Sequence, residues 1–158
     1  MENWGAMIRV ARDEDAEDFC SIIRRSIIEL CFLDHAGDNV KLEHWLSNKN
    51  VENCRQWIQN ENTCSLVAEL EGQLCGIAQM GADGHLYLLY LLPEVKGKGV
   101  GKALLQAAEQ FALERGHTRL TLESTLTARD FYTHSGYSLN QAISPCESSC
   151  LSMHKLIG

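Results

Sequence analysis

Leu86-Tyr-Leu-Leu-Tyr-Leu-Leu92 is an apolar run of strand length, and it leads into Pro93-Glu-Val95 and then Lys96-Gly-Lys-Gly-Val-Gly-Lys102. Apolar residues next recur at helical spacing from Val100 to Ala112. A proline-marked turn therefore separates a strand pattern from a glycine-rich loop and a helix pattern. This segment predicts a strand, a loop and a helix, in that order.

The glycine-rich loop has the composition of an anion-binding site. A helix N-terminus presents backbone N–H groups without intrahelical partners, and glycines let phosphate oxygens approach those groups closely. The three glycines are Gly97, Gly99 and Gly101. Positive charge comes from Lys96, Lys98 and Lys102. The pattern predicts a pyrophosphate cradle, and the alternative is a solvated, flexible Gly/Lys turn.

Two widespread nucleotide-binding loops do not fit these residues. The Walker loop needs Ser or Thr after its Gly-Lys pair, whereas Ala103 follows Lys102 here. The dinucleotide fingerprint needs a small residue where Lys102 stands, and no β-α-β unit near the N-terminus leads into the loop. A nucleotide-binding protein is therefore disfavoured.

Composition indicates a globular protein. The 158 residues fit a single domain, which we place at residues 7–158, and 45% apolar with 22% charged residues is ordinary for that class. The net charge of −7 argues against nucleic acid or an anionic membrane as the main partner, because both attract clustered positive charge. It is compatible with an amine substrate.

Cysteine usage and targeting signals both predict a cytoplasmic protein. The seven cysteines contain no Cys-x-x-Cys pair, and several fall on the apolar side of helix or strand patterns, as reduced core thiols do. Cys146, Cys150 and His154 have a spacing that zinc could use, but no four-ligand set accompanies them, so we expect no metal. Neither a signal pattern nor a membrane-spanning apolar run is visible.

The order of elements predicts a mixed, mostly antiparallel sheet. Helix patterns cover residues 13–31, in one or two pieces, 42–46, 50–58, 100–114 and 125–135. Strand patterns cover residues 8–12, 63–70, 73–80, 86–92, 119–124, 137–143 and 150–157, with a turn at Pro145 in the last pair. Because strand 119–124 follows a strand-helix unit, it should lie parallel to strand 86–92.

Two motifs resemble the GCN5-related N-acetyltransferase (GNAT) superfamily. Lys96 to Gly101 resembles its acetyl-CoA loop, in which Arg or Gln is followed by two residues, Gly, one residue and Gly or Ala. Lys96 departs from Arg or Gln at a position that acts mainly through its backbone. Phe131-Tyr132 and Gly136-Tyr137 match the family's later helix. The resemblance implies an α/β fold of the α+β type, with a sheet of about seven strands whose parallel pair splays apart around acetyl-CoA.

The resemblance also implies roles for individual residues. Tyr132 would be the general acid for the departing thiolate, since a phenol of pKa near 10 stays protonated at neutral pH. Glu123 would be the base that deprotonates the amine; His85, Tyr87, Tyr90 or no base at all are the alternatives. A backbone N–H of Leu91 or Leu92 would contact the acetyl carbonyl or the pantetheine. The residues expected at acetyl-CoA are Leu91, Leu92, Lys96, Gly97, Lys98, Gly99, Val100, Gly101, Lys102 and Phe131.

The implied activity is direct transfer of an acetyl group from acetyl-CoA to a primary amine in a ternary complex. No cysteine falls in either motif, so a covalent acyl-enzyme is not expected. The fold alone does not name the acceptor. Trp45 and Trp57 could line its pocket, although packing is the favoured role for both. A CoA-binding regulatory module without turnover is the alternative function, and family habit makes a homodimer plausible.

Overall fold

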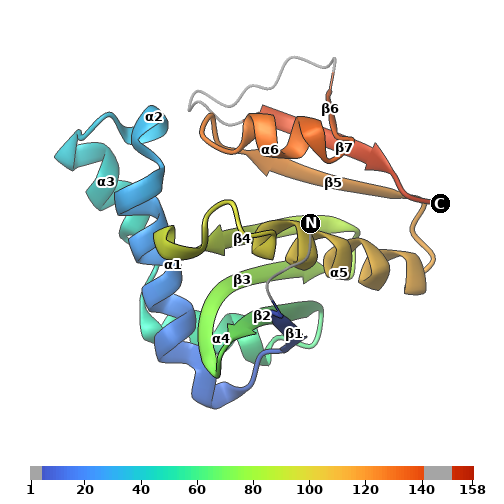
Figure 1. Cartoon of the computed structure of the whole chain (residues 1–158), viewed down its shortest axis with the longest axis horizontal. Coiled ribbons are helices and arrows are strands. Elements are labelled where there is room, and N and C mark those ends of the chain that lie inside the picture. The colour runs from blue at the N-terminus through green and yellow to red at the C-terminus, as the bar shows by residue number, and fades with distance from the viewer. Residues whose placement is uncertain (1–4, 141–150) are drawn as a thin grey trace.

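The computed structural model of the chain describes residues 5–140 and 151–158. Its strands form one sheet in the order β1-β2-β3-β4-β5-β7-β6, and β4 and β5 are the parallel pair in an otherwise antiparallel sheet (Figure 1). The strands are β1 (Met7–Val10), β2 (Thr63–Leu70), β3 (Gln73–Gly81), β4 (His85–Leu91), β5 (Arg119–Ser124), β6 (Ser138–Leu139) and β7 (Leu151–Leu156). The predicted fold class is confirmed.

Helices cover both faces of this sheet. They are α1 (Ala16–Leu30), α2 (Phe32–His35), α3 (Asn39–Leu46), α4 (Val51–Gln59), α5 (Val100–Glu114) and α6 (Arg129–His134), with 3-10 turns η1 (Asp13–Asp15) and η2 (Pro93–Val95). Within the described parts of the chain, no helix is both long and apolar enough to cross a membrane.

The predicted elements differ from the observed ones mainly at their ends. The helix expected over 13–31 begins as the 3-10 turn η1 and continues as α1, and the short helix α2 follows outside the expected range. The helix expected from residue 125 begins only at Arg129, because Thr125–Ala128 form a turn in which the Thr125 hydroxyl accepts a hydrogen bond from the Ala128 N–H (3.0 Å). The predicted turn at Pro145, with Cys146 and Cys150, lies outside the described residues.

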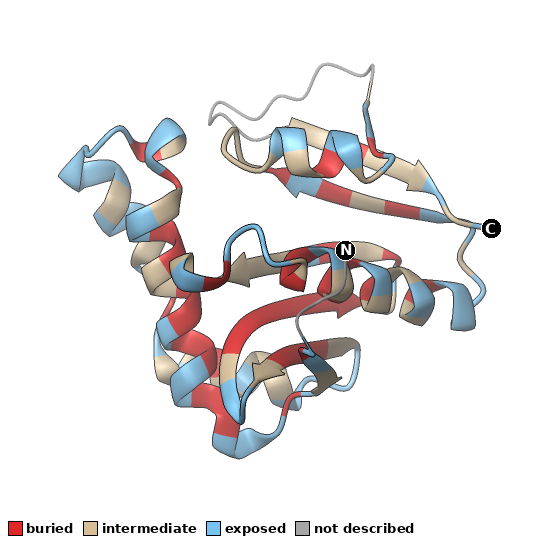
Figure 2. Ribbon diagram, viewed as in Figure 1, coloured by how far each residue is buried: buried red, intermediate tan, exposed pale blue. Residues whose placement is uncertain are grey.

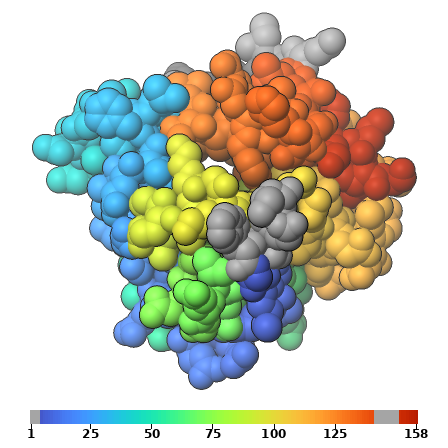
Figure 3. Space-filling view, in the orientation of Figure 1, coloured from blue at the N-terminus to red at the C-terminus, as the bar shows by residue number. Residues whose placement is uncertain are grey.

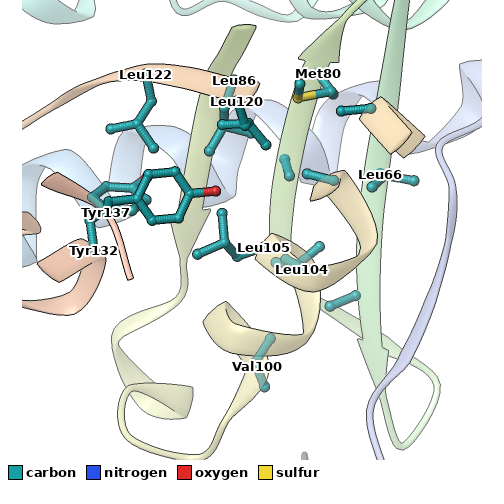
Figure 4. Close-up of a cluster of buried hydrophobic side chains, with 14 of the residues drawn as sticks. Leu66, Met80, Leu86, Val100, Leu104, Leu105, Leu120, Leu122, Tyr132 and Tyr137 are labelled. Atoms are coloured by element: carbon teal, nitrogen blue, oxygen red, sulfur yellow. The ribbon is translucent and has the colours of Figure 1, made fainter. Parts of the chain in front are cut away.

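Two apolar layers enclose the sheet, and β3 is buried along most of its length (Figure 2). On one face, Val100, Leu104 and Leu105 of α5 pack over the strands (Figure 4). On the other face, α1 and α4 supply the second layer, with Phe19 and Ile23 fully buried. The close approach of α5 requires a glycine in β3: a Cβ on Gly76 would lie 2.9 Å from the Leu104 Cδ1 atom.

The sheet is split between β4 and β5. These strands pair only at His85↔Thr121 and Leu86↔Leu122. The β3–β4 register slips immediately afterwards, so that Tyr87 is an extra residue in β4, a β-bulge. Beyond this point the two strands diverge (Figure 1), and the space between them becomes available to a ligand.

Candidate active site

The hydrogen-bond pattern of β4 shows which backbone groups face the split. The Leu92 N–H donates to the Cys75 carbonyl oxygen in β3 (2.8 Å). Successive residues of a strand direct their N–H and C=O groups to opposite sides, so those of Leu89 and Leu91 point toward β5. The ladder with β5 has ended before either residue. Of the two expected backbone donors, Leu92 has its N–H bonded within the sheet, whereas the N–H of Leu91 faces the split, as does that of Leu89.

The glycine-rich loop has the conformation of an anion cradle. Gly97 and Gly99 have φ values of +82° and +83°, and Gly99 is the N-cap of α5. The first backbone bond of the helix runs from the Ala103 N–H to the Gly99 carbonyl (3.1 Å), so the N–H groups of residues 100–102 precede the helical ladder. The start of α5 therefore offers several N–H groups and the positive end of its dipole to a ligand.

The cradle opens into a cavity of about 440 Å³ that lies in the split between β4 and β5. Figure 3 shows the yellow segment with the cradle and the orange segment with α6 facing each other across a hollow in the surface. Of the expected site residues, the cavity brings together Leu91, Lys96, Gly97, Gly99, Gly101, Lys102, Glu123, Phe131 and Tyr132. Lys98 is exposed outside this wall, and the Val100 side chain is fully buried in the core, so Val100 can contribute only its N–H.

Tyr132 and Phe131 approach the cavity from α6. A Cβ on Gly101 would stand 3.3 Å from the Leu91 Cδ1 atom and 3.4 Å from the Phe131 ring, so the start of α5 lies close to both side chains. Tyr132 is only 6% exposed. Its burial, and then the neighbouring Tyr90, raise the pKa of the Tyr132 phenol. The phenol therefore stays protonated at neutral pH and can donate a hydrogen bond into the cavity.

Glu123 is the carboxylate that lines this cavity among the described residues. It is exposed at the end of β5, where its Oε2 atom accepts a hydrogen bond from the Ser152 hydroxyl (2.8 Å). This bond leaves the second carboxylate oxygen and further lone pairs for an amine or a water molecule. The geometry is compatible with a base at the open side of the cavity.

The three alternative bases are less suitable. A hydrogen bond to Asp83 (2.6 Å) raises the pKa of the Tyr87 phenol, and burial raises that of Tyr90, so both phenols stay protonated. His85 lies outside the cavity lining, and its Nδ1 atom is 2.7 Å from the Thr121 hydroxyl.

The cavity also contains residues that the sequence patterns did not indicate. Ser26, Leu30 and Cys31 of the α1 end form one wall. Burial, and then the nearby Asp34, raise the pKa of the Cys31 thiol to about 12, against an opposing effect of Lys96. Cys31 is therefore a protonated thiol at neutral pH, unlike a nucleophilic cysteine. No local motif marks this position, because only the packing of α1 against β4 brings it to the site.

The tryptophans and the cysteines have structural roles where they are described. Trp45 and Trp57 pack against the core layer beneath α1 and α4, and neither lines the cavity. Cys20, Cys31, Cys54 and Cys75 are buried free thiols, as predicted. Among residues 5–140 and 151–158, no three His, Cys, Asp or Glu side chains are grouped as a metal site would require.

A family model described as an acetyltransferase (GNAT) domain matches residues 31–153. The chain belongs to the GNAT superfamily. Its members are acyltransferases, and the predicted family resemblance and enzyme class are thus confirmed.

Individual relatives agree with this GNAT assignment. An uncharacterized N-acetyltransferase from Archaeoglobus fulgidus is 27% identical over 139 residues, which are 79% of this chain and 88% of the relative. A GCN5-related N-acetyltransferase from Rhodopseudomonas palustris, named Aminotransferase, Class-II, has a TM-score of 0.83 at 26% identity over 95% of this chain and 94% of that one. The PaiA N-acetyltransferase of Thermoplasma acidophilum, solved with coenzyme A, shares the fold, with a TM-score of 0.81 at 24% identity over 96% and 99% of the two chains.

Proposed function

We propose that this GNAT protein transfers the acetyl group of acetyl-CoA directly to a primary amine. The observation that carries this proposal is the single cavity that joins the cradle, the unpaired edge of β4 at Leu91 and the Tyr132 phenol. Each corresponds to one requirement of the donor: N–H groups for the pyrophosphate, backbone partners for the pantetheine and acetyl carbonyl, and a proton donor for the thiolate. The coenzyme A bound to the PaiA relative supports the choice of donor.

In the proposed reaction, the neutral amine attacks the thioester carbonyl carbon, forming the C–N bond. The Leu91 N–H faces the split and stabilises the carbonyl oxygen as it becomes negative. The C–S bond then breaks, and Tyr132 donates a proton to the thiolate. Glu123 takes a proton from the amine, directly or through water. The net charge of −7 favours approach of a cationic acceptor before it is deprotonated.

Direct transfer also agrees with the state of Cys31. A thiol whose pKa is raised to about 12 has little thiolate at neutral pH, so an acetyl-cysteine intermediate is disfavoured. We expect Cys31→Ala to retain most of the transfer rate and initial-velocity plots to show intersecting lines. Parallel lines, together with loss of activity in Cys31→Ala, would show a covalent intermediate instead.

The decisive experiment combines binding and turnover in one preparation. Calorimetric titrations with acetyl-CoA, CoA and ATP are followed by thiol release from acetyl-CoA in the presence of spermidine, tyramine, lysine or a basic peptide. We expect selective binding of acetyl-CoA and CoA, and thiol release that depends on an amine. Binding without release from any amine would favour the CoA-binding regulatory module. ATP binding as tight as that of CoA would contradict the proposed donor. The cytoplasmic location and a homodimer also stay predictions, which cell fractionation and light scattering test.

A further inference from the structure

The carboxylate of Asp34 joins two segments that stand on opposite sides of the cavity. Its Oδ1 atom accepts a hydrogen bond from the Leu126 N–H (2.7 Å). Its Oδ2 atom accepts bonds from the Thr127 N–H (3.2 Å) and the Thr127 hydroxyl (2.7 Å). Asp34 belongs to α2, whereas Leu126 and Thr127 form the turn between β5 and α6. We refer to these three bonds as the Asp34 clasp.

The clasp lies across the split in the sheet. Cys31, three residues before Asp34, lines the cavity at the end of α1, which contacts β4, and Thr127 lines it from the turn that follows β5. Figure 1 shows α2 at the end of α1, the helix that contacts β4, and α6 together with β5 and β7. The layer formed by β5, α6, β6 and β7 is tied to α5 elsewhere, through bonds from Tyr137 and Lys155 to Glu109 (2.8 and 3.1 Å). The clasp therefore fixes this layer from the side of α1 and α2.

Asp34 is itself held firmly. The next residue, His35, is 3% exposed and bonded through both ring nitrogens. Its Nδ1 atom accepts from the Gly37 N–H (3.0 Å), so the proton resides on Nε2, which donates to the Ile27 carbonyl (3.1 Å). These bonds hold α2 against the end of α1, so the Asp34 carboxylate has a fixed position.

A short path of bonds leads from the clasp to Tyr132. The turn that contains Thr127 is closed by the bond between the Thr125 hydroxyl and the Ala128 N–H (3.0 Å). The Ala128 carbonyl in turn accepts from the Tyr132 N–H (3.1 Å). A shift of the clasped turn would therefore move the start of α6 and its phenol, and a displacement of about 1 Å at a reacting group can cost on the order of a hundredfold in rate.

We propose that Asp34 is a positioning residue for acetyl transfer, which fixes the β5–α6 turn across the cavity and so holds Tyr132 at the donor sulfur. This inference rests on the proposed function. It differs from a purely structural role in one respect: loss of the clasp lowers kcat while donor binding, which depends on the cradle of α5, persists.

The test uses paired variants of the full chain. Asp34→Ala removes all three clasp bonds, and Thr127→Val removes the bond from the Thr127 hydroxyl. Thr127→Ser keeps that hydroxyl and should retain most of the rate that Thr127→Val loses. Asp130→Asn is the charge-matched control, since the Asp130 side chain is 82% exposed on α6 and its ion pair within the described residues is with Arg129, at 3.7 Å. Thiol release gives kcat and KM, calorimetry gives the acetyl-CoA Kd, and hydrogen exchange in saturating CoA reports on residues 125–134.

We expect Asp34→Ala and Thr127→Val to lower kcat by about tenfold or more while the Kd for acetyl-CoA changes by less than about threefold. Exchange should rise in residues 125–134 and stay unchanged in β2 and β3. Wild-type kcat with wild-type exchange in both variants would overturn the proposal, as would losses of kcat and donor affinity in equal proportion. If the wild type releases no thiol with any amine, the proposed function fails. In that case, unchanged hydrogen exchange in the variants would overturn the role of the clasp separately. Faster exchange confined to residues 125–134 would support the role of Asp34 in positioning the β5–α6 turn.

Discussion

Tyr132 shows how burial can prepare a single side chain for its chemistry. Replacing it by Phe removes the hydroxyl and keeps the ring that packs between Phe131 and Tyr137. Because the proton donor is lost while the cradle is untouched, we expect kcat to fall by about a hundredfold or more and the acetyl-CoA Kd to change little. Thiol-release kinetics and calorimetry measure the two effects. An unchanged kcat would assign Tyr132 to packing alone.

Asp15 is a residue at which charge and stability are closely linked. It is 7% exposed, and its carboxylate accepts bonds from Arg9 (2.8 and 3.1 Å) and from the Arg12 N–H (2.7 Å). The bond from Arg9 is the main reason that the pKa of Asp15 lies below its ordinary value. The stability it contributes is therefore complete above the unfolded-state pKa and is lost as the pH falls through the folded-state value.

We expect Asp15→Asn to lower the free energy of unfolding by about 2 kcal/mol at neutral pH, because hydrogen bonds to a charged group are lost. The difference from the wild type should begin to shrink below about pH 4, where the carboxylate of the unfolded chain takes up a proton, and should vanish only when the pH has fallen below the lower folded-state pKa. Urea unfolding at a series of pH values measures this. Asp18→Asn, at an exposed position of α1, is the control, and a pH-independent difference would contradict the charge-based explanation.

At the scale of elements, the two ends of α5 offer a matched comparison. Gly99 at its start and Gly116 just beyond its end both have positive φ, +83° and +86°. A β-branched residue is strained at either position, so Gly99→Val and Gly116→Val should both lower stability, by about 1–2 kcal/mol. Only Gly99→Val places a side chain in the cradle. We therefore expect this variant alone to weaken acetyl-CoA binding, by about tenfold or more, because a charge-assisted hydrogen bond to the phosphate is lost. Equal affinities in calorimetry would refute the cradle.

Local patterns predicted most elements because their causes are local. The helix over 100–114 and the strands over 63–70 and 119–124 match α5, β2 and β5 at both ends, since glycines, turns and periodicity mark them in sequence. The start of α6 was misplaced because the bonds that hold residues 125–128 in a turn include those that Leu126 and Thr127 donate to the distant Asp34. Propensity over a short segment contains no such information.

At the scale of the whole molecule, the ligand is expected to join two parts of the sheet that hold few bonds to each other. The β4–β5 ladder has two residue pairs, and the cavity separates the strands beyond it. A donor that binds only the folded chain should raise the free energy of unfolding by about 2.7 kcal/mol at a hundredfold excess over its Kd. Thermal unfolding at increasing acetyl-CoA measures this. No rise in Tm, or an equal rise in Gly99→Val, would contradict binding in the split.

The sequence by itself determined the order of elements, the parallel pair and the glycine-rich loop, because glycine positions, periodicity and chain connectivity are all local or nearly so. The expectation that Tyr132 and Glu123 share one site came from the resemblance to the GNAT superfamily. Only the tertiary structure decided which β4 backbone groups face the split, through the bulge at Tyr87. It alone brought Cys31 into the cavity and Asp34 onto Thr127, 93 residues later in the chain. Contacts between such distant residues depend on how packed layers meet, which no single segment encodes.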